Sequence, residues 1–300
     1  LRASGHHGRA TFSRRALAAH VYVSEGRDRG IISRIAAAGA ASGAVVCNTF
    51  VDPTYNRTGL TLASTDATKI EGGVDAICHE ALQTLDLRKH VATHPRLGLV
   101  DHVACNPLGT ATSAEAAELA ARIGARLGDG AGGAGGAGGA SPVPVFFYGA
   151  AREDLRSLAE LRRCLGYFSG AAKGEWSGLS HEMKTAIVQL PADRGPVGQV
   201  HNYNLLVVAD LEEAEVMRRC RRIAKSISER GGGLDKVETM ALPHEKGVEV
   251  ACNLLDADIT PPAKVRERVV ELCQVEGVRL ESDYFTNKSP EDILDLVYAS

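Results

Sequence analysis

Apolar residues in the first half of the chain follow two different periods, and the order of these periods predicts a fold. Runs or alternations of apolar residues predict strands at residues 19–23, 44–50, 58–64 and 143–148. Apolar residues that recur every three to four positions predict helices at 27–41, 68–85 and 113–127. Apart from the helix at 113–127, the order is strand, helix, two strands, helix, strand, which is that of a ferredoxin-like sandwich.

The second half repeats this pattern over a shorter length. Strands are predicted at 203–209, 237–242 and 248–254, and helices at 212–230 and 262–276. Pro196-Val197-Gly198 runs almost directly into Asn202, so this half lacks an opening strand. The sequence thus predicts an α/β (α+β) protein of two ferredoxin-like α/β sandwich subdomains. The first spans residues 20–180, and the second, at residues 190–300, is shortened and incomplete.

Two stretches differ in composition from the predicted elements. Residues 1–19 carry four arginines and no acidic residue, which is typical of an organelle-targeting leader or a disordered tail. Residues 129–140 are rich in glycine and alanine and contain a literal G-x-G-x-x-G at 130–135. This segment follows a helix and precedes a strand, the reverse of the dinucleotide-binding order, so we interpret it as a flexible insertion.

Composition narrows the classes of partner. The 300-residue chain has a formal net charge of -3 and an isoelectric point near 6.4, which gives no electrostatic footprint for nucleic acid. No apolar run approaches the roughly 20 residues that a membrane-spanning helix needs. Seven cysteines are scattered without C-x-x-C spacing, which favours a reducing compartment. We expect a cytoplasmic protein that binds neither nucleic acid nor membrane, although the basic leader also allows an organelle.

The segment Thr93–His102 concentrates candidate chemistry. It holds a base, His94, a guanidinium, Arg96, and a carboxylate, Asp101, around the rigid backbone of Pro95 and the turn residue Gly98. Proline pushes the preceding histidine out of helical geometry, so its imidazole is presented from a loop. The alternative interpretation is an ordinary loop histidine at a helix end.

A metal site is the other interpretation of this segment. His90 and His94 have the spacing of two zinc ligands on one helical face, but Pro95 argues against a helix there, and no third ligand has convincing spacing. We therefore predict no metal.

Asn56-Arg57-Thr58, at the start of a strand, offers an amide, a guanidinium and a hydroxyl that can hold a carboxylate.

Several segments, in their order along the chain, resemble the formiminotransferase family, in particular its shorter plant-type members. The most specific are His94-Pro95-Arg96-Leu97-Gly98 with Asp101, and Tyr148-Gly149-Ala150. The other matching segments are Ser24-Glu25-Gly26-Arg27, Asn56-Arg57-Thr58, Val143-Pro144-Val145, Gly195-Pro196, Asn202 with Asn204, and Ala251-Cys252-Asn253-Leu254-Leu255. The resemblance covers residues from about 20 to 275.

The resemblance implies a folate-binding cleft between two ferredoxin-like subdomains, usually in a homodimer. It also implies transfer of a formimino group between N-formimino-L-glutamate and tetrahydrofolate, with tetrahydrofolate as co-substrate. His94 aligns with the family's catalytic histidine and would act as general base and acid. Arg57 and Arg96 are candidates for binding carboxylates, and Asp101 for orienting the site. The remaining candidate binding residues are Asn56, Gly98, Tyr148, Gly149, Asn202 and Asn204.

The chain also departs from the family pattern. Family members carry acidic residues in the strand before the Asn-Arg pair, whereas this chain has Asn48-Thr49-Phe50, and its nearest acid is Asp52. An acidic residue of the family is replaced by Thr93. Because a general base depends on the charges around it, these losses keep a second interpretation open. That interpretation is a catalytically degenerate folate-binding or interaction protein of the same fold.

Overall fold

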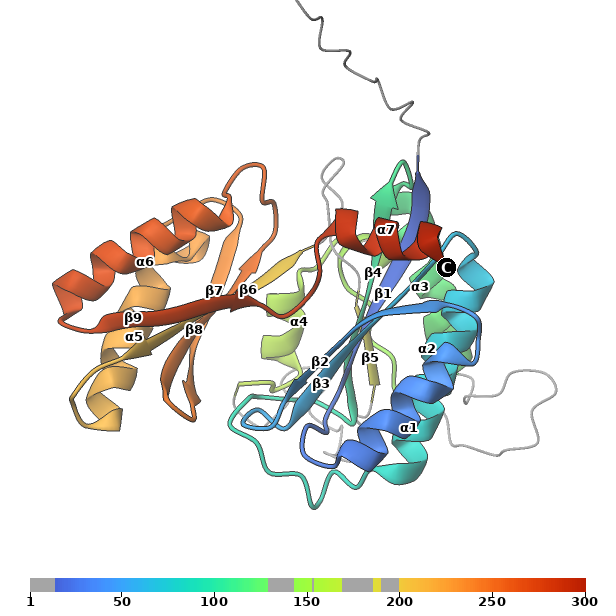
Figure 1. Cartoon of the computed structure of the whole chain (residues 1–300), viewed down its shortest axis with the longest axis horizontal. Coiled ribbons are helices and arrows are strands. Elements are labelled where there is room, and N and C mark those ends of the chain that lie inside the picture. The colour runs from blue at the N-terminus through green and yellow to red at the C-terminus, as the bar shows by residue number, and fades with distance from the viewer. Residues whose placement is uncertain (1–13, 129–142, 153, 169–185, 190–199) are drawn as a thin grey trace, which may run out of the picture.

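The computed structural model describes residues 14–128, 143–152, 154–168, 186–189 and 200–300, and it folds into two α/β domains (Figure 1). The first domain begins with a βαββαβ unit. Its elements are β1 (Arg15–Val23), α1 (Arg29–Ala40), β2 (Val45–Asp52), β3 (Arg57–Ser64), α2 (Ala67–Thr84) and β4 (Val100–Gly109). The elements that follow are α3 (Ser113–Gly128), a short 3-10 helix (Gly149–Ala151), α4 (Leu158–Cys164) and β5 (Ala186–Gln189).

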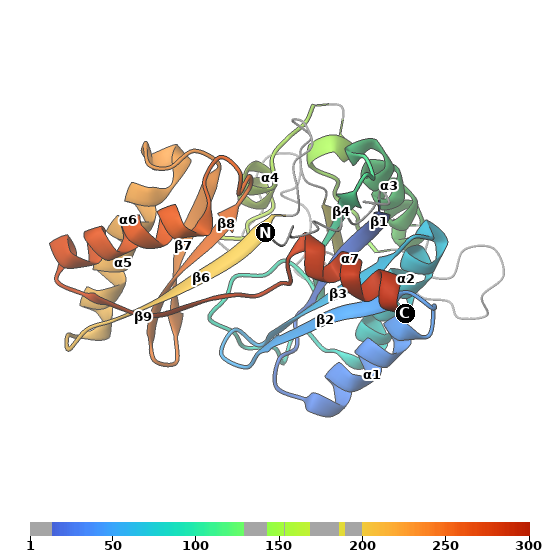
Figure 2. The ribbon, with the colours of Figure 1, turned by 45° about the horizontal axis from the view of Figure 1, so that its top comes forward.

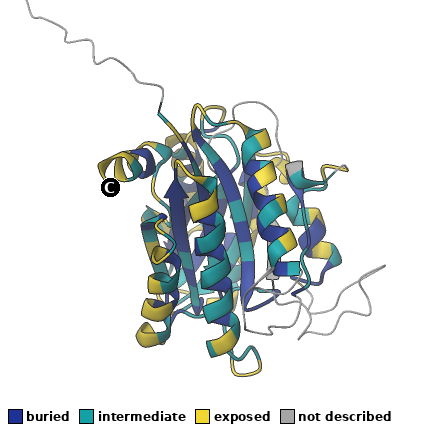
Figure 3. Cartoon of the chain, turned by 90° about the vertical axis from the view of Figure 1, so that its right-hand side faces the viewer, coloured by how far each residue is buried: buried dark blue, intermediate teal, exposed yellow. Residues whose placement is uncertain are grey.

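The first sheet has the strand order β2-β3-β1-β4-β5. Its first four strands are antiparallel, and β5 runs parallel to β4. Alternate residues of the central strand β1, among them Ala19, Val21 and Val23, pack with α1, α2 and α3 in the main core. Figure 3 shows these helices with exposed residues on their outer sides and the buried strands behind them.

The second domain is built from β6 (His201–Val208), α5 (Glu213–Ile227), β7 (Val237–His244), β8 (Gly247–Leu254), α6 (Pro262–Glu276) and β9 (Arg279–Phe285). Its strand order, β7-β8-β6-β9, repeats the order of the first four strands of the first domain. The prediction of two ferredoxin-like sandwiches is therefore confirmed. The second is not shortened: β6 is itself the opening strand, and the unpredicted β9 supplies the fourth.

The last helix, α7 (Pro290–Ala299), returns to the first domain. Figure 2 shows it lying across the first sheet, far from the helices of the second domain. Ile293 and Leu294 form a small core there with residues on the face of the sheet opposite α1 to α3. The chain therefore crosses between the domains twice, and residues 290–299 pack with the first.

Other predictions need correction at the level of elements. Residues 143–148 form no strand, and the fourth strand of the first unit is β4 instead. The central strand β1 begins at Arg15, so the predicted leader or tail at 1–19 overlaps it by five residues. The predicted insertion at 129–140 lies outside the described residues. So do most of the residues between the two predicted subdomains, 20–180 and 190–300, apart from β5.

The seven cysteines of the chain are all free thiols. Within the described parts of the chain, every helix is too short or too polar to cross a membrane.

The two sheets face each other with polar residues. On β1, the residues that alternate with the core positions are His20 and Tyr22; on β6, they are Asn202 and Asn204. The Tyr22 hydroxyl donates to the Asn202 side-chain oxygen across the domain boundary at 3.3 Å. Because side chains alternate between the two faces of a strand, the polar residues of β1 and β6 lie at the boundary between the domains, where they can bind or react with a ligand.

Candidate functional site

The loop that carries His94 is held in place by the strands beside it. The Ser24 hydroxyl donates to the Gly98 carbonyl oxygen at 2.7 Å, and the Ser24 backbone N–H donates to the Leu99 carbonyl oxygen at 2.8 Å. Leu97 is buried in a cluster that includes Phe146, Tyr148, Leu161, Leu165 and Tyr167. The loop is therefore anchored on both sides of Gly98, which gives His94 a fixed position.

Asp101 links this loop to β3. Its carboxylate accepts a hydrogen bond from the Leu97 N–H at 2.7 Å and another from the Arg57 guanidinium at 2.6 Å. Arg162, on α4, brings a second guanidinium to within 3.8 Å of the same carboxylate. Burial alone would raise the pKa of Asp101, but Arg57 and Arg162 outweigh it and lower the pKa to about 2. Asp101 is therefore ionised at neutral pH.

His94 is held as a neutral base. Its Nδ1 lies 2.7 Å from the Pro95 carbonyl oxygen, which can only accept, so Nδ1 carries the ring hydrogen and Nε2 the lone pair. Burial and then the charge of Arg57 lower the pKa of His94 to about 3. The side chain is only partly buried, so it keeps the access that proton exchange with a ligand requires. The arrangement presents an unprotonated imidazole beside two guanidinium groups.

Aromatic side chains surround these charges. The rings of Tyr55 and Tyr167 meet the His94 ring edge-on, with centroids 5.2 and 6.4 Å away. Tyr22 stacks on His102 at 5.4 Å, and the Arg57 guanidinium lies over the Tyr22 ring at 4.6 Å. Flat rings next to guanidinium groups are the side chains that suit a planar heterocycle carrying carboxylates.

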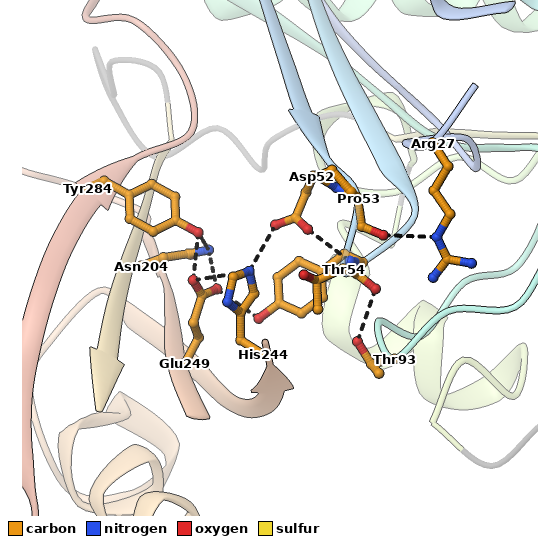
Figure 4. A network of polar contacts seen from close by, with 10 residues as sticks. Arg27, Asp52, Pro53, Thr54, Thr93, Asn204, His244, Glu249 and Tyr284 are labelled. Carbon is orange, nitrogen blue, oxygen red and sulfur yellow. Dashed lines mark hydrogen bonds and ion pairs between the residues drawn. The ribbon is translucent and has the colours of Figure 1, made fainter. Parts of the chain in front are cut away.

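The second domain brings a buried carboxylate to the same boundary (Figure 4). Glu249 on β8 has no solvent exposure and accepts hydrogen bonds from Tyr55, Tyr284 and Asn204 at 2.7, 2.6 and 2.9 Å. His244, at the end of β7, lies 3.6 Å from Asp52 and 3.9 Å from Glu249. Asp52 and Tyr55 belong to the first domain, so this cluster joins the two domains.

Several predicted binding residues have structural partners. Arg96 donates to His90 Nδ1 at 2.6 Å and to the His90 carbonyl oxygen at 2.8 Å. The Asn56 side chain accepts from the Gly26 N–H and donates to the Val91 carbonyl oxygen, in a turn where its own φ is +47°. The structure therefore gives Arg96 and Asn56 roles in holding the loop together.

The remaining predicted residues are brought to the boundary between the domains or beside it. Tyr148 is buried, with its ring 6.3 Å from that of His102, and Gly149 follows it with a φ of +59°. Asn202 bonds to Tyr22 and, at 2.7 Å, to Asn253, while Asn204 bonds to Glu249. Asn202 and Asn204 therefore lie on the face of β6 that meets the first domain.

Sequence reasoning missed the residues that complete the arrangement: Tyr22, Tyr55, His102, Arg162, Tyr167, His244 and Glu249. Two of them carry a signal. Glu249 is an acidic residue inside an apolar strand, which is costly unless the carboxylate has partners. His102 directly follows Asp101 in the segment that the motif had singled out. The others lie far away in the sequence, with no pattern that pairs them.

Among the described residues, no group of three or more His, Cys, Asp or Glu side chains is arranged to hold a metal ion. His90 lies in the loop after α2, where its Nε2 contacts the Asn56 carbonyl oxygen at 2.8 Å. Its other ring nitrogen accepts from Arg96, so both nitrogens of His90 have partners within the protein.

The fold and this cluster define a two-domain α/β protein with a neutral histidine, paired guanidinium groups and aromatic rings where its sheets meet. The family model described as formiminotransferase domain, N-terminal subdomain, matches residues 16–209. A formiminotransferase cyclodeaminase-like protein of Arabidopsis thaliana is 33% identical over 296 residues, which is 92% of this chain and 94% of that protein. The chain belongs to the formiminotransferase family.

More distant relatives agree. Formimidoyltransferase-cyclodeaminase of Sus scrofa is 27% identical over 79% of this chain, and the match spans 43% of that longer protein. Glutamate formimidoyltransferase of Streptococcus pyogenes serotype M1 is 26% identical over 70% of this chain and 67% of that protein. Membership of this family supports folate-dependent formimino transfer as the general activity, with tetrahydrofolate as the family's co-substrate.

Proposed function

We propose that this protein transfers a formimino group between N-formimino-L-glutamate and tetrahydrofolate, with His94 as the acid and base. The observation that carries the proposal is the state of His94. A hydrogen bond from Nδ1 to the Pro95 carbonyl leaves Nε2 with the lone pair, and burial holds the ring neutral. A base that is unprotonated at neutral pH is what attack by an amine requires.

The steps follow from this state. The attacking amine of tetrahydrofolate adds to the formimino carbon as the electron pair of the C=N double bond moves onto the imino nitrogen, and His94 Nε2 takes the proton that the amine loses. The tetrahedral adduct then collapses: the C=N double bond re-forms, the bond from that carbon to the glutamate nitrogen breaks, and the glutamate nitrogen takes the proton back from His94. The imidazole therefore ends as it began.

The charges nearby fit both substrates. Arg57 and Arg162 share Asp101 as a counter-ion, so an anionic group that enters beside them meets a surplus of positive charge. Formiminoglutamate and the glutamate tail of a folate both carry carboxylates, which guanidinium groups bind well. Asp101, which is held by Arg57 and by the Leu97 N–H, would orient the loop rather than react.

The test combines binding and turnover in one sample. The purified protein is titrated calorimetrically with tetrahydrofolate, formiminoglutamate is then added, and absorbance is followed for the formimino-folate product. We expect binding and turnover in the native protein. In His94→Ala we expect no measurable transfer and an affinity for tetrahydrofolate within a few-fold of native, because a general base acts in the reaction rather than in binding.

His79→Ala, on the surface of α2, is the matched histidine control and should keep its activity. Turnover retained in His94→Ala would contradict the assigned role. Binding without turnover in the native protein would favour the alternative, a folate-binding protein that has lost catalysis. That alternative draws on Asn48-Thr49-Phe50, which stands where the family carries acidic residues. A cytoplasmic location and a homodimer stay predictions from the sequence.

A further inference from the structure

Tyr55 lies between two imidazoles that come from different domains. It belongs to the turn between β2 and β3, is 5% exposed, and its N–H donates to the Asp52 carboxylate at 2.8 Å. Its ring meets the ring of His94 at 5.2 Å and that of His244 at 5.2 Å, in both cases edge-on. The ring therefore has little room to move without moving His94.

The hydroxyl of Tyr55 is fixed by the second domain. It donates to Glu249 at 2.7 Å, and burial together with the charge of Glu249 raises the pKa of Tyr55, so the hydroxyl keeps its hydrogen. Tyr167, the other tyrosine against His94, has a buried hydroxyl with no hydrogen-bond partner among the residues that the structure describes. Of these two tyrosines, Tyr55 is thus the one that a hydrogen bond ties to the second domain.

Glu249 is itself rigidly held. Asn204 on β6 and Tyr284 on β9 donate to its carboxylate, which sits on β8 between these strands and the first domain. Asn204 donates to the same oxygen, Oε2, that accepts from Tyr55, whereas Tyr284 donates to Oε1. The oxygen that binds Tyr55 is therefore held by Asn204 even when the Tyr284 hydroxyl is absent, and a buried carboxylate needs such donors. The sheet of the second domain thereby fixes the end of the Tyr55 side chain.

We propose that Glu249 is a positioning residue for His94, acting through Tyr55 across the domain boundary. The inference rests on the proposed function, in which His94 is the acid and base. The second domain then does more than cover the substrate: it holds the ring that fixes the orientation of the imidazole. Small errors in the orientation of a general base are costly, since misplacement by about 1 Å can lower a rate by about a hundredfold.

Two tyrosine variants provide the test. Tyr55→Phe and Tyr284→Phe each remove one hydroxyl from the same carboxylate, but only Tyr55→Phe breaks the link to the first domain. We expect Tyr55→Phe to lower kcat by about tenfold or more, with KM for formiminoglutamate within about threefold. Tyr284→Phe should stay within about twofold of native in both constants. Equal losses of kcat in the two variants would overturn the proposal.

A readout without turnover separates this proposal from the proposed function. In protein labelled at histidine, the ring resonance of His94, assigned by its loss in His94→Gln, is compared among the variants. It should shift in Tyr55→Phe and stay at its native position in Tyr284→Phe. If the native protein binds tetrahydrofolate without transfer, the proposed function fails, and the resonance alone decides on positioning.

A further variant, Glu249→Gln, keeps the proposal testable if Tyr55→Phe does not fold. Glu249→Gln leaves one acceptor oxygen for two hydroxyl groups, so the hold on Tyr55 weakens while the volume is kept. If Tyr55→Phe does not fold, a shifted His94 resonance in Glu249→Gln supports the proposal. An unchanged resonance in the variant that folds overturns it.

Discussion

Asp101 decides how the loop between Leu97 and β4 is arranged, because it is a fully buried carboxylate with partners on both sides. Leu97 holds one oxygen through its backbone N–H, and Arg57 holds the other. Arg162, itself 8% exposed, adds a second positive charge. An ionised group in such a place is stable only while its partners remain, so removing its charge leaves the buried guanidinium of Arg162 and the partly buried one of Arg57 without this counter-ion.

Asp101→Asn should therefore lower the free energy of unfolding by about 3–5 kcal/mol, the usual cost of breaking a buried ion pair from one side. Chemical denaturation at pH 7.5 measures this change.

Asp86→Asn is the matched control. Asp86 pairs with Arg88 and Lys89, whose side chains are 77% and 84% exposed, so solvent screens the pair and we expect a much smaller change than in Asp101→Asn. If Asp101→Asn costs no more than this control, the buried pair does not hold the loop.

Some residues of this site could be predicted from the sequence and others could not, and the difference has a physical reason. His94, Arg57 and Asp101 belong to short motifs in which proline, glycine and charged side chains occur together, so local chemistry revealed them. Glu249 and Tyr55 are 194 positions apart and meet only after both domains have formed. No local pattern predicts such a contact. The alternation of polar and apolar residues along a strand indicates which face is polar, but it does not indicate which residue of another domain will contact that face.

At the scale of elements, the periodic spacing of apolar residues predicted which side chains are buried better than it predicted which segments pair as strands in a sheet. Residues 143–148 have the apolar pattern of a strand, and Val143, Phe146 and Tyr148 are indeed buried, but their backbone joins no sheet. β9 was missed for the opposite reason. It is an edge strand paired only with β6, and an edge tolerates the charges of Arg279, Glu281 and Asp283.

Helix α7 covers the face of the first sheet that α1 to α3 leave open, through a small contact. Ile293 is fully buried and Leu294 is 6% exposed against Ala16, Ala18, Cys47, Ala63 and Leu108. Small residues on that face let the helix approach closely. A cluster this small depends on each of its large side chains.

Ile293→Ala should lower the free energy of unfolding by about 2–4 kcal/mol, the cost of deleting a large buried side chain and leaving a cavity. Leu296→Ala, on the same helix but 38% exposed, should change it by less than about 0.5 kcal/mol. Thermal and denaturant unfolding of both variants measure the difference. If the two variants unfold alike, α7 contributes nothing to the stability of the first domain.

At the scale of the whole molecule, the first domain folds around histidines that stay neutral. Burial lowers the pKa of His20 to about 4 and that of His94 to about 3, with Arg57 adding to the shift of His94. Burial and then Arg162 and Arg57 hold the pKa of His102 well below its usual value. An unfolded histidine has a pKa of about 6.5, so below that pH the unfolded chain binds protons that the folded protein does not.

Stability should therefore fall as the pH is lowered through 6.5 and go on falling toward about 4. Each of these histidines can contribute at most about 1.4 kcal/mol per pH unit in that window. Burial raises the pKa of Glu238, which acts in the opposite sense and reduces the slope. Denaturant unfolding at pH 7.5, 6.5 and 5.5 measures the trend, and His20→Gln, which keeps a polar side chain but does not titrate, should flatten it. If the free energy of unfolding falls no faster in the native protein than in His20→Gln between pH 7.5 and 5.5, His20 binds a proton in the folded protein and its neutral state is wrong.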